Sequence, residues 1–111
     1  MTAWATSPLR GALEDVPVVA ILRRCPPVHT PALARAAVNA GIRAVEVTLA
    51  SDRPLEQIAA VRRHVPEATV GAGTVTTPEE LRAAPAHRAQ FAVSPCFFPP
   101  VADAASEGRV P

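Results

Sequence analysis

The sequence predicts an α/β domain made of successive β/α units around a parallel sheet. Two observations support this fold class. Short apolar runs begin at residues 16, 44, 69 and 91, so they recur every 22 to 28 residues, and a helix-entry signal follows each run. This spacing suits parallel strands joined by right-handed crossovers. A complete eight-fold β/α barrel needs roughly 200 residues or more, so the 111 residues here allow half of one.

The predicted strands are short apolar runs bounded by turn residues or charged residues. They cover residues 16–22, 44–49, 69–72 and 91–94. We expect the first strand to be buried on both faces, because it is apolar almost throughout, and to end at Arg23. Val110 and Pro111 would begin a fifth strand.

The predicted helices share a proline at or next to their first position. They begin at Pro31, Pro54, Pro78 and Pro99. Thr30 can cap the first of them, and Gly41 ends it. Thr77 and Glu80 match a capping box, in which the glutamate reaches back to the backbone of the capping threonine. Gly108 is expected to end the last helix as a left-handed stop.

The composition narrows the class of protein. A net charge of +1 gives no field for nucleic acid or membrane, and no apolar stretch has the length of a membrane span or the form of a signal peptide. Cys25 and Cys96 form no CxxC pair, which favours a reducing, cytoplasmic setting. No long linker intervenes, so we expect one domain over residues 1–111, with residues 1–15 as a lead-in segment.

Glu46 is the most informative single residue, because it is an acid inside a strand of valines and alanines. A carboxylate there loses its hydration unless it faces a polar cavity or a cation. If the carboxyl group of Glu46 faced a cavity, its pKa would be raised and it could act as a general base. The alternative is a structural acid paired with a nearby arginine. The residues alone leave both interpretations open.

Further candidates lie where other strands end, since functional groups gather at the carboxyl ends of parallel strands. Gly73 allows a ligand to approach the backbone closely, and Thr74 adds a hydroxyl, although a tight turn would explain both. Arg23 could bind a carboxylate or phosphate through bidentate hydrogen bonds, or could be a solvated strand terminus.

No metal-ligating or nucleophilic cluster is predicted. The sequence has no closely spaced set of histidines and carboxylates, so no metal is expected. No histidine is identifiable as a base for Cys96, so we interpret Cys96 as a packed small residue. His29, His64 and His87 fall in helical or loop positions and are interpreted as surface groups.

Four blocks carry a family resemblance. They read VPVVAILR at residues 16–23, GIRAVEVTL at 41–49, VGAGTV at 70–75 and QFAVSP at 90–95. In this order they resemble the class I KDPG (2-keto-3-deoxy-6-phosphogluconate) aldolases, a group that includes 4-hydroxy-2-oxoglutarate aldolases. The resemblance implies a (β/α)8 TIM barrel, of which this chain would hold the first four β/α units. It also implies a homotrimer that cleaves KDPG to pyruvate and glyceraldehyde 3-phosphate through a lysine Schiff base, without cofactor or metal.

The resemblance also implies roles for individual residues. Glu46 would be the general acid and base that moves protons through a bound water. Arg23 and Thr74 would hold the carboxylate end of a keto acid or phosphorylated sugar acid, while Gly73 and Pro95 would line the pocket. Ala50 stands where many relatives carry a substrate-binding arginine, for which Arg53 is a candidate substitute, and Cys96 stands where a glycine is common.

The missing lysine limits what this chain does alone. All eleven basic residues are arginine, and the lysine of the family would lie on a later strand. We therefore expect the amino-terminal part of an aldolase that is inactive in isolation, with open sheet edges that favour self-association. The alternatives are a keto-acid-binding subunit without catalysis and a small independent flavodoxin-like α/β domain.

Overall fold

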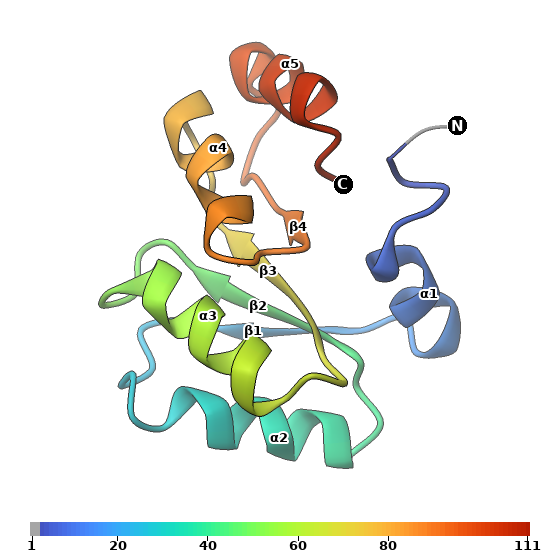
Figure 1. Ribbon diagram of the computed structural model, residues 1–111, viewed down its shortest axis with the longest axis vertical. Coiled ribbons are helices and arrows are strands. Elements are labelled where there is room, and N and C mark those ends of the chain that lie inside the picture. Colours follow the sequence, from blue (N-terminus) through green and yellow to red (C-terminus); the bar gives the residue numbers. More distant parts are fainter. Residues whose placement is uncertain (1–2) are drawn as a thin grey trace.

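A computed structural model describes residues 3–111 and contains a four-stranded parallel sheet (Figure 1). The strands lie side by side in chain order, each paired in parallel with the next. They are β1 (Val19–Leu22), β2 (Ala44–Thr48), β3 (Thr69–Gly73) and β4 (Phe91–Ala92). The predicted β/α repeat and its parallel sheet are confirmed.

Residues 3–111 form five helices, which lie on the two faces of this sheet (Figure 1). They are α1 (Pro8–Asp15), α2 (Thr30–Asn39), α3 (Pro54–His64), α4 (Pro78–Ala86) and α5 (Pro99–Gly108). The last four pack on one face, where Val45, Val47 and Val70 meet buried helix residues such as Ile58 and Leu81. None of the helices within residues 3–111 has the length and apolar character needed to cross a membrane.

Helix α1 covers part of the opposite face, within the segment predicted only as a lead-in. Ser7 caps its first turn through its side chain, and Leu9 and Ala12 pack on Ala44 and Phe91. This second small core lies toward the amino ends of the strands, because Ala44 is the first residue of β2. The face is therefore covered at one end of the sheet, and the predicted site residues lie toward the other end.

The expectation that the first strand is buried on both faces is wrong. β1 begins only at Val19, because Pro17 has no N–H group and Val18 donates its N–H to the Val16 carbonyl in a turn. β1 is an edge strand, and Ile21 is 58% exposed on the face opposite the core helices. No helix in the described part of the chain covers this face at the middle of β1.

The other edge of the sheet shows how the chain continues past β4. The Val93 N–H donates to the Ala72 carbonyl at 2.8 Å, so the ladder with β3 extends beyond β4 itself. The Ala92 N–H donates to the Pro111 carbonyl at 3.0 Å. Pro111 thus lies beside β4, although residues 110 and 111 form no strand here, and the fifth strand stays a prediction.

The predicted helix ends are partly correct. The Thr77 side chain caps α4 by accepting from the Glu80 N–H at 3.1 Å, as predicted, but the Glu80 carboxylate accepts from the Thr76 N–H instead of the Thr77 N–H. Thr30 is not a cap, because it is already the first helical residue of α2. Gly108 is the last residue of α5, and the left-handed stop is the next residue, at φ 54°.

Candidate active site

Glu46 lies in the middle of β2 on the face opposite the core helices, and it is only 6% exposed. Gly73 of β3 leaves the space that this carboxyl group occupies, since a Cβ at residue 73 would overlap it. Burial raises the pKa of Glu46, and the positive charge of Arg23 opposes part of that rise. The carboxyl group therefore keeps its proton to higher pH than an exposed glutamate, which suits a group that both gives and takes protons.

Arg23 and Thr74 meet beside Glu46 at the carboxyl ends of β1 and β3. The Arg23 guanidinium donates from Nη2 to Thr74 Oγ1 at 3.4 Å and remains exposed to solvent. Within residues 3–111, no ion pair joins Glu46 to an arginine, and Arg23 acts on it through its positive charge. A guanidinium and a protonatable carboxyl group thus face the same open end of the sheet.

The backbone of Thr74 is strained. Its φ is 60°, in the left-handed region, which β-branched residues rarely adopt. Such conformations cost of order 1–3 kcal/mol and persist where surrounding contacts hold them, often at functional sites. Here the conformation accompanies the contact between the Thr74 hydroxyl and Arg23. Four of the predicted site residues, Arg23, Glu46, Gly73 and Thr74, are therefore neighbours.

The remaining predicted residues lie in the loops and on the surface. Pro95 is exposed in the loop between β4 and α5, and its place in a substrate pocket stays a prediction. The interpretation of Cys96 as a packed residue is wrong, because Cys96 is an exposed free cysteine. The three histidines are exposed, as predicted for surface groups. Across residues 3–111, no group of three or more His, Cys, Asp or Glu side chains could hold a metal ion.

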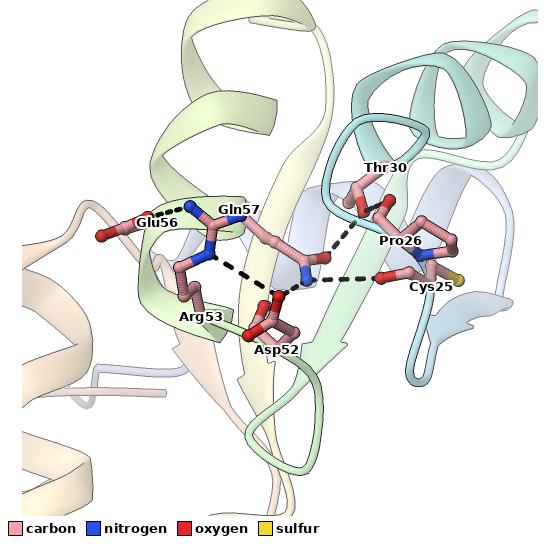
Figure 2. A network of polar contacts seen from close by, with 7 residues as sticks. All are labelled: Cys25, Pro26, Thr30, Asp52, Arg53, Glu56 and Gln57. Carbon is pink, nitrogen blue, oxygen red and sulfur yellow. Dashed lines mark hydrogen bonds and ion pairs between the residues drawn. The ribbon is translucent and has the colours of Figure 1, made fainter.

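A buried polar network links the loop after β1, which begins at Arg23, with the loop after β2 (Figure 2). Gln57 of α3 contacts Thr30, Cys25 and Asp52, and nearby Ser51 contacts Thr48 and the backbone of the residue after Arg23. The sequence did not point to Gln57 or Ser51. The available signal was a glutamine in the first turn of a helix, which is ordinary at the surface.

A cleft of about 790 Å³ opens between α3 and α4 and reaches the site at Thr74. Ala50, Arg53 and Thr74 line it, together with the acidic side chains Glu56 and Glu79. Arg53 is held by ion pairs with Asp52 and Glu56, at 3.6 and 3.5 Å (Figure 2). Arg53 is therefore placed at the cleft, whereas Arg23 lies beside Glu46.

Comparison with solved structures shows the same fold in KDPG aldolases. The KDPG aldolase of Zymomonas mobilis ZM4, solved with 3-phosphoglycerate, superposes with a TM-score of 0.84 at 29% identity and covers 93% of this chain and 49% of that one. The KDPG aldolase of Legionella pneumophila, solved with pyruvate as a covalent carbinolamine intermediate, gives a TM-score of 0.86 at 28% identity, covering 97% and 52%. The sheet and its helices are thus a partial TIM barrel.

Sequence comparison agrees. The KHG/KDPG aldolase of Escherichia coli K12 and the 2-dehydro-3-deoxy-phosphogluconate aldolase of Dickeya dadantii are each 40% identical over 111 residues, which is all of this chain and 52% of each relative. The chain spans about half the length of these curated relatives. The family model for KDPG and KHG aldolase matches residues 9–111. The chain therefore belongs to the KDPG and KHG aldolase family.

Proposed function

We propose that this chain supplies the proton-transfer group and the carboxylate-binding groups of a class I aldolase acting on a 2-keto acid. The observation that carries the proposal is the buried carboxyl group of Glu46, which lies against Gly73 with the Arg23 guanidinium nearby. Arg23 and the Thr74 hydroxyl would bind the carboxylate of the keto acid. The chain has no lysine, so the amine that forms the Schiff base would come from outside these 111 residues.

In the proposed reaction, the lysine amine condenses with the keto carbon, releases water and forms an iminium. The bond between C3 and C4 then breaks, its electron pair passes to the iminium, and the C4 hydroxyl proton goes to Glu46 through a bound water. This step releases the aldehyde and leaves an enamine. Glu46 then returns a proton to C3, and hydrolysis frees pyruvate. The raised pKa of Glu46 supports this double role, because one group must accept and donate.

The proposed substrate is KDPG, cleaved to pyruvate and glyceraldehyde 3-phosphate, with 4-hydroxy-2-oxoglutarate as the related substrate. The names of the relatives and the pyruvate captured in the Legionella structure support this choice. We extend the proposal to a cytoplasmic homotrimer acting in the Entner-Doudoroff pathway, with Pro95 lining the pocket. This extension rests on the family resemblance.

An NMR titration of the 111-residue chain with pyruvate tests the binding half of the proposal. We expect the largest chemical shift changes at Arg23, Glu46 and Thr74, and at least a tenfold loss of affinity in Arg23→Ala, because a charge-assisted bidentate contact is removed. Arg63→Ala is a matched control, since Arg63 is an exposed arginine of α3. Shifts spread over the surface, or equal affinity in Arg23→Ala, would refute the proposal.

The absence of lysine favours a second candidate, a subunit that binds keto acids without turnover. Joining the chain to the lysine-bearing half of a relative separates the two functions. Cleavage of KDPG by the joined protein, lost in Glu46→Gln, would support the aldolase. Pyruvate binding without cleavage would support the binding subunit. Borohydride reduction of the isolated chain with pyruvate should leave no side-chain adduct in either case, because the chain lacks a lysine amine.

A further inference from the structure

We propose that Gln57 and Ser51 are positioning residues that clamp the loop after β1 and thereby fix the place of Arg23. The clamp joins two loops, residues 23–29 after β1 and residues 49–53 after β2. The inference rests on the proposed function, because it assigns to the clamp a role in keto-acid binding. Neither residue lies in the predicted site, and each acts through the backbone of the loop that carries Arg23.

Gln57 provides the inner half of the clamp (Figure 2). It is 2% exposed, and its Nε2 donates to the carbonyls of Asp52 at 2.5 Å and Cys25 at 3.4 Å. Its Oε1 accepts from the Thr30 hydroxyl at 2.7 Å. The orientation of the amide follows from these partners, because an oxygen turned toward the two carbonyls would leave both without a donor. One side chain therefore satisfies groups from both loops and from the start of α2.

Ser51 provides the outer half. Its Oγ accepts from the Arg24 N–H at 2.9 Å and lies 3.1 Å from the Thr48 hydroxyl, at the end of β2. Arg24 has a φ of 56°, in the left-handed region, so its backbone turns sharply directly after Arg23. The hydrogen bond to Ser51 holds this unfavourable conformation against the end of the neighbouring strand.

The backbone of Arg23 is thus fixed on both sides. Leu22 before it pairs with Val47 in the sheet, while Arg24 and Cys25 after it are held by Ser51 and Gln57. Within residues 3–111, the Arg23 side chain makes one hydrogen bond, the 3.4 Å contact with Thr74, so its position depends mainly on the position of its own backbone. A preorganised guanidinium loses less conformational entropy when it binds a carboxylate, which increases affinity.

Two variants remove the clamp while leaving Arg23 in place. Ser51→Ala deletes the acceptor for the Arg24 N–H, and Gln57→Leu deletes all three Gln57 contacts at similar side-chain size. We expect each to weaken pyruvate binding about 3- to 10-fold in the NMR titration, the range set by the ordering of one or two side chains. Even without ligand, amide hydrogen exchange at Arg24 should accelerate in Ser51→Ala.

The matched control is Val61→Ala, which truncates a fully buried core residue of the same helix. It should lower the melting temperature while changing pyruvate affinity less than twofold, with all variants measured at a temperature where they are folded. Equal weakening in Val61→Ala, or unchanged affinity in both clamp variants, would overturn the proposal.

The titration and the exchange measurement together show which proposal is refuted, the clamp or the proposed function. If the wild-type chain shows no pyruvate-induced shifts at Arg23, the proposed function falls. Faster exchange at Arg24 in Ser51→Ala would then still support the clamp as the device that places Arg23. Unchanged exchange at Arg24 would overturn it, whatever the ligand does.

Discussion

The carboxyl group of Glu46 occupies the volume in which a Cβ at Gly73 would lie. The two residues are on adjacent strands, and Glu46 is directly opposite Gly71 in the register, so its side chain leans toward the carboxyl end of β3. Glycine at residue 73 thus makes room for a buried acid between two strands. The raised pKa of Glu46 therefore depends on glycine at residue 73, which leaves room for the carboxyl group to be buried.

Gly73→Ala should therefore displace the Glu46 side chain while costing the protein little stability. The new methyl group overlaps the flexible end of the Glu46 side chain, which can rotate toward the open face of the sheet. In water the carboxyl group loses the burial that raises its pKa, so we expect its pKa to fall toward the ordinary glutamate value. NMR titration of the carboxyl carbon measures it. An unchanged pKa would contradict the geometry described here.

Gly71→Ala should instead destabilise the protein more than it changes the surroundings of Glu46. A Cβ at residue 71 would overlap the ring of Phe91, which is fully buried and packs against α1. The ring has no open space to enter, so we expect a loss of about 1–3 kcal/mol in the free energy of unfolding, as for other overpacked cores. Urea unfolding measures it, with Gly11→Ala as control. Nothing lies within 4 Å of a Cβ at residue 11, in α1, so that variant should be neutral or more stable by up to about 1 kcal/mol.

The raised pKa of Glu46 predicts a pH dependence of stability. Between the unfolded and folded pKa values the folded state binds more protons, so the free energy of unfolding falls as pH rises through that window. Glu46→Gln should remove this decline. Urea unfolding across the acidic to neutral range checks it through the difference between the two proteins, because groups such as Glu67, whose pKa is lowered, add a slope of opposite sign to both. Parallel curves would mean that Glu46 is not buried in solution.

Arg23→Gln provides the complementary test. Arg23 opposes the rise in the pKa of Glu46, so its removal should raise that pKa further and extend the window of falling stability to higher pH. A window that moves to lower pH would show that Arg23 and Glu46 do not interact as the structure indicates.

The sequence predicted the elements that depend on local chemistry. Thr77 before Pro78 marks the start of α4, and the strand positions follow from apolar runs, because these signals act within a few residues. The site residues Arg23, Glu46 and Thr74 could also be predicted to converge, since parallel strands bring their carboxyl ends to one edge.

Features that depend on tertiary context could not be predicted. Ile21 looks like any core residue in the sequence, yet it is exposed because no helix within residues 3–111 covers its face of the sheet at the middle of β1. Gln57 and Ser51 look like surface residues, and only the approach of two loops buries them. Ser7 before Pro8 is a local cap signal for α1, although residues 1–15 are predicted only as a lead-in segment.

The cap of α4 gives a direct test of a local prediction. Thr77→Ala removes the acceptor for the Glu80 N–H and should cost about 0.5–2 kcal/mol of unfolding free energy. Thr77→Ser keeps a hydroxyl and should retain most of that stability. Urea unfolding compares the two variants. Equal losses in both would mean that the methyl group of Thr77, and not its hydroxyl, stabilises the helix.

The open face of the sheet predicts self-association that one substitution should reduce. Ile21 is more than half exposed at the centre of edge strand β1, where unpaired backbone groups and apolar surface together favour pairing with another chain. Ile21→Ser should change the unfolding free energy by no more than about 0.5 kcal/mol, because the side chain is largely exposed. It should nevertheless lower the weight-average sedimentation coefficient, because less associated species forms, and it should lower the binding of an apolar dye. Ile58→Val is the control, since it trims a fully buried residue and should cost about 0.5–1.5 kcal/mol without changing association. Association that responds equally to both variants would follow global stability and not the exposed strand.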